Sequence, residues 1–290
     1  MLAVILALLS AIGFGGSDFA AGLASRAASV IAVTVLGELV STLVIALAVP
    51  FGGGGALTAV TARWAAVAGA AGVTGAMVLY LGFRHAQFSV ASTVSAVGAA
   101  VLSVAAGLLF GERPTALALT GIALAIPAIA AVSASPGGGA SAGAAVGSRG
   151  RQVAGVGYGA AAGLCFAVYF TGLDRAGSGH GLWPVFVAQC TALAVAVMAG
   201  AVTGQLRLPA PGTRLQSVCT GVAGIAGTTL FFLASRRGLL AVTAVITSLY
   251  PGSTILLARV LLAERLSRMR LAGLVLAAAS VALIAVAGTH

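Results

Sequence analysis

The sequence predicts an all-α polytopic membrane protein with ten transmembrane helices, arranged as two inverted five-helix repeats. Three observations predict this fold class. Hydrophobic residues make up 60% of the chain and charged residues only 7%, whereas a soluble domain carries about 25% charged residues. Apolar segments of spanning length recur along all 290 residues, and the C-terminal parts of the two halves align with each other without a gap. Such a chain cannot cover itself with a surface that faces water.

The basic residues indicate a lipid partner. All fifteen are arginines, and they are scattered among apolar segments, although the net charge is +10. On a soluble domain that charge would suggest nucleic acid, but arginines at the ends of spans contact lipid headgroups. We therefore expect membrane lipid and no nucleic acid as partner. The three cysteines have no metal-ligand or disulfide spacing, and no metal site, cofactor or catalytic residue is predicted.

Ten apolar segments reach the roughly 20 residues that a spanning helix needs. Breaks such as "SRAAS", "GERPT" and "DRAGSGHG" separate them, and a longer Gly-, Ser- and Ala-rich stretch near the middle of the chain is typical of a flexible linker. We predict a first five-helix repeat over 1–134, a flexible linker over 135–152 and a second five-helix repeat over 153–290. The expected helices lie near 2–22, 30–50, 64–83, 88–110, 115–134, 153–173, 182–203, 215–235, 239–262 and 271–288.

The internal repeat has an offset of 152 residues. Residues 72–133 and 224–285 share 14 identities in 62 positions, including the pairs Glu112/Glu264 and Arg113/Arg265. A chain that crosses the membrane five times ends on the opposite side, so the second repeat is inverted, as in many secondary transporters. Each Glu-Arg pair falls in the turn before the last helix of its half. We expect these four residues to be structural corners, with the glutamate beside the positive N-terminal end of the following helix.

These features resemble the drug/metabolite transporter superfamily, EamA type. The resemblance rests on two five-helix halves, on a Glu-Arg corner in each, and on "GFGGSDFAAGLASR" (13–26), which is similar to the first-helix signature of that family. It implies two EamA-like repeats in an inner-membrane carrier for a small-molecule substrate, often an exporter, present as a monomer or homodimer. It also implies cytoplasmic termini, whereas the arginine count favours termini on the outer side, so the orientation stays open.

Two acidic residues within spans are the first candidates for substrate binding or coupling. A charge at mid-span costs roughly 2.5–3.5 kcal/mol on insertion scales. Glu38 lies near the centre of its segment and could bind a proton or a cationic substrate, or could be a protonated packing residue. Asp18 could face a cavity if its helix continues past residue 22, or could bond at the membrane interface if the helix ends there.

Neutral polar residues complete the candidate site. Pro251 interrupts the ninth segment because it removes a backbone donor and clashes with the carbonyl of Thr247. Paired interruptions in corresponding helices indicate a binding site, and the equivalent position in the first half, Gly98-Ala99, is a softer irregularity. We expect Tyr250 and Thr247 to line the cavity, although a packing kink is the alternative. Further candidates are Tyr169, Tyr80 and Gln189.

The predicted function is secondary-active transport, with export as the expected direction. The substrate is a small polar or amphipathic metabolite or drug, moved by alternating access with possible coupling to protons at Glu38 or Asp18. A lipid flippase or a channel of the same architecture is the alternative, followed by an intramembrane enzyme acting on a lipid-linked substrate. The sequence does not choose between amino acids, sugars, nucleosides and cationic drugs as substrate.

Overall fold

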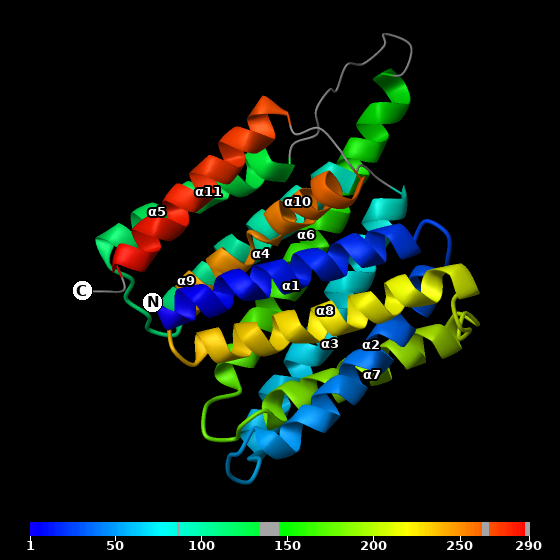
Figure 1. Cartoon of the computed structure of the whole chain (residues 1–290), viewed down its shortest axis with the longest axis horizontal. Helices are drawn as coiled ribbons and strands as arrows, with labels where there is room; N and C mark the ends of the chain where they lie inside the picture. The colour runs from blue at the N-terminus through cyan, green and yellow to red at the C-terminus, as the bar shows by residue number, and fades with distance from the viewer. Residues whose placement is uncertain (86–87, 134–144, 263–266, 288–290) are drawn as a thin grey trace.

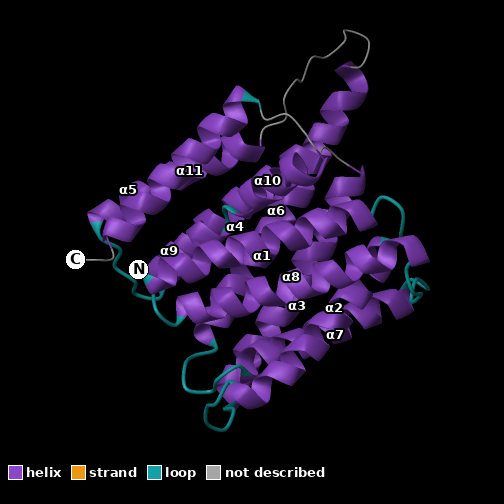
Figure 2. Ribbon diagram, viewed as in Figure 1, coloured by secondary structure: helices purple, strands orange, loops and turns teal. Residues whose placement is uncertain are grey.

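A computed structural model describes residues 1–85, 88–133, 145–262 and 267–287, and this part of the chain is helical with no strand. The helices run side by side in one bundle, and short turns join many of them (Figures 1 and 2). The helices are α1 (Leu2–Ala24), α2 (Val30–Ala48), η1 (Val49–Phe51), α3 (Ala59–His85), α4 (Phe88–Leu109), α5 (Ala116–Ser133), α6 (Ala145–Arg175), α7 (Trp183–Val202), α8 (Pro211–Ser235), α9 (Leu240–Thr247), α10 (Tyr250–Leu262) and α11 (Arg268–Ala287).

Seven helices within the described ranges are long and apolar enough to cross a membrane. They correspond to seven of the ten predicted spans. The predicted spans near 115–134 and 271–288 appear as shorter apolar helices, over Ala116–Ala131 and Leu271–Ala287. The chain is therefore a multi-pass membrane protein. The seven helices are Leu2–Ala24, Val30–Phe51, Ala59–His85, Val90–Leu109, Val153–Arg175, Trp183–Val202 and Pro211–Ser235.

The remaining predicted span, 239–262, is divided into α9 and α10 by a turn at Ser248-Leu249. The break lies just before Pro251, where the chain lacks the backbone donor that would bond to the carbonyl of Thr247. Hydrogen bonds to the residue three positions back replace the α-helical pattern here. The amide of Leu249 donates to the carbonyl of Ile246 at 3.1 Å, and that of Gly252 donates to the carbonyl of Leu249 at 2.8 Å. In contrast, the irregularity expected at Gly98-Ala99 is absent, because α4 is one continuous helix.

The predicted linker is also partly helical. Helix α6 begins at Ala145, eight residues before the predicted start of the second repeat at 153. The segment 145–152 contains Ala, Val, two arginines and a glutamine beside two glycines and a serine. The first five are compatible with a helix once a long span continues from the segment. Composition alone suggested a coil here, because glycine and serine dominate the stretch before it. The rest of the predicted linker, 135–144, lies outside the described residues.

The most extensive helix contacts join the N-terminal and C-terminal parts of the chain. Helix α1 packs on α8 and α10, α2 on α7 and α8, α3 on α6 and α7, α4 on α6 and α9, and α5 on α11. Figure 1 shows α1 lying between α10 and α8 across the middle of the view. The two parts of the chain are thus interleaved, so a space enclosed by the central helices is lined by both of them.

Small residues allow this close packing. A Cβ atom on Gly13 would lie 2.8 Å from the Cα atom of Gly227, so α1 and α8 touch backbone to backbone at this point. Ser10 donates a hydrogen bond to the carbonyl of Gly227 at 2.7 Å, and Ser41 donates one to that of Gly221 at 2.8 Å. Helices in membranes associate through such small residues and interhelical hydrogen bonds, because apolar burial gives no driving force in lipid.

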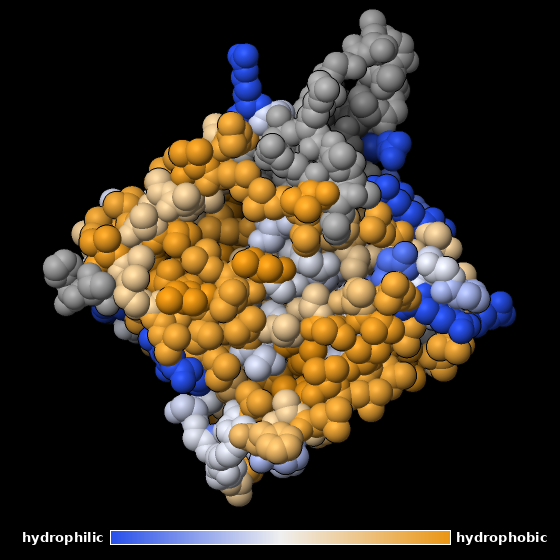
Figure 3. All heavy atoms as spheres, viewed as in Figure 1, coloured by the Kyte–Doolittle hydropathy of each residue, from blue (hydrophilic) through white to orange (hydrophobic). Residues whose placement is uncertain are grey.

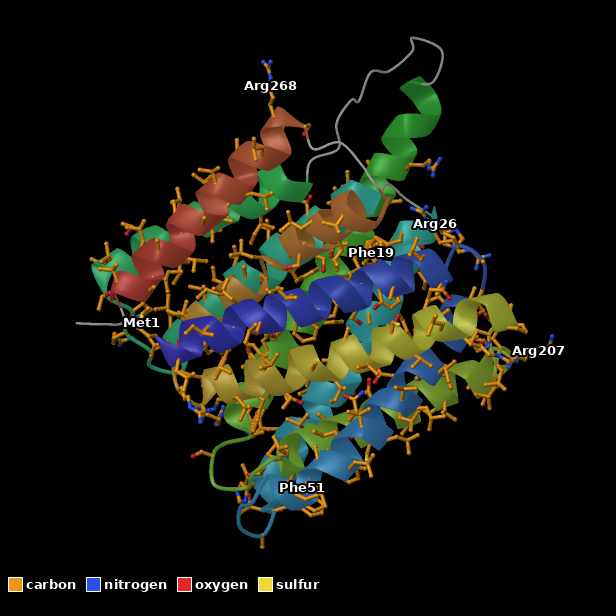
Figure 4. The ribbon with its side chains drawn as sticks, viewed as in Figure 1. Met1, Phe19, Arg26, Phe51, Arg207 and Arg268 are labelled. Atoms are coloured by element: carbon orange, nitrogen blue, oxygen red, sulfur yellow. The ribbon has the colours of Figure 1, made fainter. Side chains whose placement is uncertain are left out.

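The outer surface agrees with a membrane location. Apolar residues cover the middle of the visible face, and hydrophilic residues gather toward its edges (Figure 3). Arg26, Arg207 and Arg268 lie at helix ends on one side of the bundle, whereas Met1 and Phe51 lie on the opposite side (Figure 4). Arginines at helix ends can reach lipid headgroups.

Candidate substrate cavity

A central cavity lies between α1, α2, α3, α6, α7, α8 and the first residue of α10. It offers about 120 Å³ of space to the centre of a water-sized sphere. One water molecule needs roughly 10–15 Å³ of such space, so the cavity has room for several waters or a small solute. Most of its lining is apolar or aromatic, with a few polar side chains, which is the usual composition of a small-molecule site.

Glu38 is the first acidic group of the cavity. It lies on α2, and its carboxylate accepts a hydrogen bond from the side-chain amide of Gln189 on α7. The backbone carbonyl of Glu38 accepts a bond from Thr42 at 2.7 Å, so this turn of α2 is internally bonded. The pair joins one helix from each half of the chain. Because the amide is neutral, it orients the carboxylate without cancelling its charge.

Asp18 is the second acidic group. It lies on α1, which continues to Ala24, so the residue is inside the helix rather than at its end. The hydroxyl of Tyr80 on α3 is 3.4 Å from the Asp18 carboxylate. Tyr80 also lies within electrostatic range of Glu38. The next residue along the cavity wall, Ser17, donates to the backbone carbonyl of Thr220 on α8 at 3.0 Å and ties α1 to α8.

Two further tyrosines complete the polar lining. The Tyr169 hydroxyl on α6 and that of Thr228 on α8 are 2.8 Å apart and hydrogen-bonded, and the tyrosine is buried. Tyr250 is buried at the start of α10, just after the break in the helix. Its hydroxyl lies near Ser95 and within electrostatic range of Asp18, but it makes no hydrogen bond of normal geometry. The cavity therefore contains one buried hydroxyl with unused bonding capacity.

Six of the seven predicted site residues line this one cavity. Thr247 is the exception, because it is fully buried in α9 and is not part of the lining. A continuous helix would place residues 247 and 250 on one face, but the turn at Ser248-Leu249 separates them. The expectation that Thr247 faces the cavity is therefore wrong. The six residues are Glu38, Asp18, Tyr250, Tyr169, Tyr80 and Gln189.

The sequence did not single out the aromatic and hydroxyl residues that complete the wall. Phe14, Phe166 and Phe170 line the cavity, as do Thr228 and Ser41. The Phe14 ring is edge-on to both Tyr169 and Phe170, with centroid distances of 6.3 Å. Phenylalanines in a span look the same whether they face lipid or a cavity. The sequence could have indicated them only through their position within one helical turn of the polar residues Ser17, Asp18 and Tyr169.

A charged cluster lies at the helix ends on the side of the N-terminus. Arg236, just after α8, forms an ion pair of 3.1 Å with Asp174 near the end of α6. Burial lowers the pKa of Arg236 from its ordinary value, and the neighbouring Asp174 carboxylate opposes that shift. Arg175 lies over the Phe110 ring at 4.6 Å, and Phe110 packs edge-on against Trp64 of α3. Four segments of the chain are thus joined here.

Glu112 joins the same cluster and caps α9. Its carboxylate accepts hydrogen bonds from the backbone amides of Leu240 and Ala241, the latter at 2.9 Å. The capped helix belongs to the other half of the chain, a contact that the sequence analysis did not predict, because it expected Glu112 only beside the N-terminal end of the helix that follows it. Arg113 is exposed and donates to the carbonyl of Glu112 at 3.1 Å. The second corner, Glu264 and Arg265, lies outside the described residues.

Two glycines give Glu112 this position. Gly111 has a φ of +93° and ends α4, with its amide bonded to Leu108 and the Glu112 amide bonded to Gly107 at 2.9 Å. This is the Schellman pattern, which favours glycine at the left-handed position. A Cβ on Gly107 would collide with the Glu112 carboxylate. The run from 107 to 112 thus turns the glutamate back under α4 and toward α9.

We expect Glu112→Gln to weaken the start of α9. A charged acceptor of helix amides contributes about 1.5–3 kcal/mol, and the glutamine keeps one acceptor oxygen but no charge. The amides of Leu240 and Ala241 should exchange hydrogen faster in mass spectrometry, and the thermal midpoint should fall. Arg113→Gln is the matched control at the exposed neighbour and should change neither. Equal exchange in Glu112→Gln and in the natural protein would contradict the capping role.

The fold and the cavity define the class: a multi-pass α-helical membrane protein with an acidic cavity between its helices. Residues 153–286 match the model of the EamA-like transporter family. This match covers the C-terminal part of the chain and supports the resemblance to the EamA type of the drug/metabolite transporter superfamily that the sequence indicated.

Two further comparisons concern single proteins and solved structures. No curated protein matches the chain. Solved structures do match, and they number 27 chains. One of these, described only as "Crystal structure of protein", has a TM-score of 0.70 and 20% sequence identity, and the similarity covers 95% of each chain. At this level of identity the likeness shows a shared fold alone.

Proposed function

We propose that the chain is a secondary-active transporter of the inner membrane. It moves a small polar or amphipathic metabolite or drug by alternating access, with export as the direction and protons as the coupling ion. The observation that carries the proposal is the central cavity, where Glu38 on α2 meets Gln189 on α7 inside the spans. Intramembrane acids that face a cavity mark substrate and ion pathways in transporters.

The proposal includes ten spans in two inverted repeats, over 1–134 and 153–290. Equivalent contacts support it. A Cβ on Gly72 would meet the ring of Tyr169, and a Cβ on Gly224 would meet the hydroxyl of Ser17. Gly72 and Gly224 are 152 positions apart in the sequence, and so are Ser17 and Tyr169. The second contact is therefore the repeat equivalent of the first. The packing of α3 on α6 likewise corresponds to that of α1 on α8, as a two-fold axis in the membrane plane requires.

The broken helix provides further support. Irregular backbone at membrane depth is tolerated where it is buried in protein or lines a cavity, and Tyr250, which lines the cavity, follows the break directly. Discontinuous helices at the substrate site are common in secondary transporters. In this proposal the α9–α10 turn lets one part of the span move relative to the other while the cavity opens on alternate sides.

Transport by the purified protein in liposomes tests the proposal. The vesicles carry a proton gradient and receive a labelled panel of amino acids, sugars, nucleosides and organic amines. We expect saturable uptake of at least one class, which the gradient increases and dissipation of the gradient abolishes. A linear current without saturation would indicate a channel, and movement of labelled phospholipid between leaflets would indicate a flippase. Either result in place of saturable uptake would overturn the proposal.

A further inference from the structure

The charges that line the cavity all have one sign. Asp18 and Glu38 are both part of the wall, and none of the other lining residues is an arginine or a histidine. The described arginines lie near helix ends or in the loops between helices, and the one described ion pair, Arg236 with Asp174, lies at the end of α6. Two carboxylates thus share a buried space that contains no positive side chain.

Within the described residues, the donors to these carboxylates are neutral. Glu38 accepts from the Gln189 amide, and Asp18 has the Tyr80 hydroxyl at 3.4 Å. Each carboxylate has about four acceptor positions, so each can accept further hydrogen bonds from a ligand. A buried charge is costly unless it is paired or neutralised. Whatever occupies the cavity in the charged state must therefore bring positive charge, either as protons or as part of a ligand.

The walls between the acids suit an organic cation rather than a metal ion. Phe14, Phe166 and Phe170 present aromatic rings, and Val73 and Ala192 present aliphatic surface. A cation within about 6 Å of an aromatic ring is attracted by the ring electrons, and the apolar wall favours a hydrocarbon body. No group of three or more His, Cys, Asp or Glu residues close enough to hold a metal is found among the described residues.

We infer that the substrates of this cavity are organic cations, with a protonated amine or an ammonium group on a small aromatic or aliphatic body. The inference rests on the proposed transport function and gives it a substrate class. Asp18 and Glu38 bind the cationic group, Tyr80 lies between them, and the phenylalanines hold the body. An anionic solute of the same size would face two carboxylates with no basic partner and is excluded.

Binding to the purified full-length protein in detergent tests this inference through the charge of the ligand. The probes are 2-phenylethylamine and 3-phenylpropionate, which have similar bodies and opposite charges at pH 7, with 2-phenylethanol as the neutral analogue. We expect the amine to raise the thermal midpoint in a saturable way, the alcohol to have a small effect, and the carboxylate to have none. Because only the ligand changes in this comparison, the misfolding of a variant cannot explain a difference in binding.

Variants assign the binding to the two acids. Asp18→Asn and Glu38→Gln should each weaken amine binding at least tenfold by isothermal calorimetry. Thr74→Ala should leave it unchanged, because Thr74 is exposed on α3 and bonds only to the carbonyl of Ala70 in its own helix. Binding of the carboxylate as tight as that of the amine would overturn the inference.

The outcomes also separate the inference from the proposed function. Saturable transport of an anion or sugar by a protein that does not bind amines would overturn the inference and leave the transporter in place. Amine binding without flux in liposomes would support the binding site and overturn the transport function.

Discussion

Replacing Glu38 by glutamine is expected to abolish uphill accumulation of a transported amine by proteoliposomes with a proton gradient. The natural protein should concentrate the amine severalfold inside the vesicles, whereas Glu38→Gln should reach only equal concentrations. The reason is that the amide has no proton to release or take up on the timescale of transport. The carboxylate of Glu38 is within the spans and accepts a hydrogen bond from the neutral amide of Gln189, with Tyr80 and Tyr169 in electrostatic range.

The measurement is the ratio of internal to external amine, with and without the gradient. Amine concentrations should be well above the weakened affinity of the variant, so that lost binding is not mistaken for lost coupling. Asp18 is the other acid of the cavity, and Asp18→Asn shows whether both carboxylates carry protons. Thr74→Ala is the control for reconstitution. A Glu38→Gln protein that accumulates the amine as well as the natural chain would exclude proton coupling at this residue.

Gly69→Ala is expected to have the largest effect on stability. A Cβ on Gly69 would collide with the backbone carbonyl of Ala188, so α3 and α7 touch at this point. Backbone atoms cannot rotate away as a side chain can, and overpacking of this kind costs about 1–3 kcal/mol or more. Gln189, which holds Glu38, is the next residue on α7, so separation of these helices also disturbs the cavity.

Gly157→Ala is the matched control for this prediction. Gly157 is exposed on α6, and a Cβ there would have nothing within 4 Å. In the interior of a helix, alanine is favoured over glycine by about 0.8–1 kcal/mol. We therefore expect the thermal midpoint of Gly69→Ala to fall strongly at a fixed heating rate, and that of Gly157→Ala to stay or rise. Equal thermal midpoints for the two variants would show that α3 and α7 accommodate the added methyl group without loss of stability.

Parts of the fold and site were predictable because membranes make some residues conspicuous. Asp18 and Glu38 stood out because a charge in a span is costly, and both line the cavity. The interior wall was not predictable at Phe14, Phe166 and Phe170, because lipid and a cavity wall accept the same side chains. The partner of Glu112 was not predictable either, since the contact with α9 joins residues 128 positions apart.

The cap on α9 has a consequence for the balance between conformations. The repeat partners of Gly107 and Gly111 are Arg259 and Ala263, so the second Glu-Arg corner lacks both glycines that position Glu112. In the proposed transport cycle, two equal halves would populate the two access states equally. The charged cap would favour the state that contains it, and one such bond of about 1.5–3 kcal/mol corresponds to a population ratio of roughly 10 to 150. We therefore expect the empty protein to rest with the Glu112 side closed, and the bound ligand to supply the free energy that opens it.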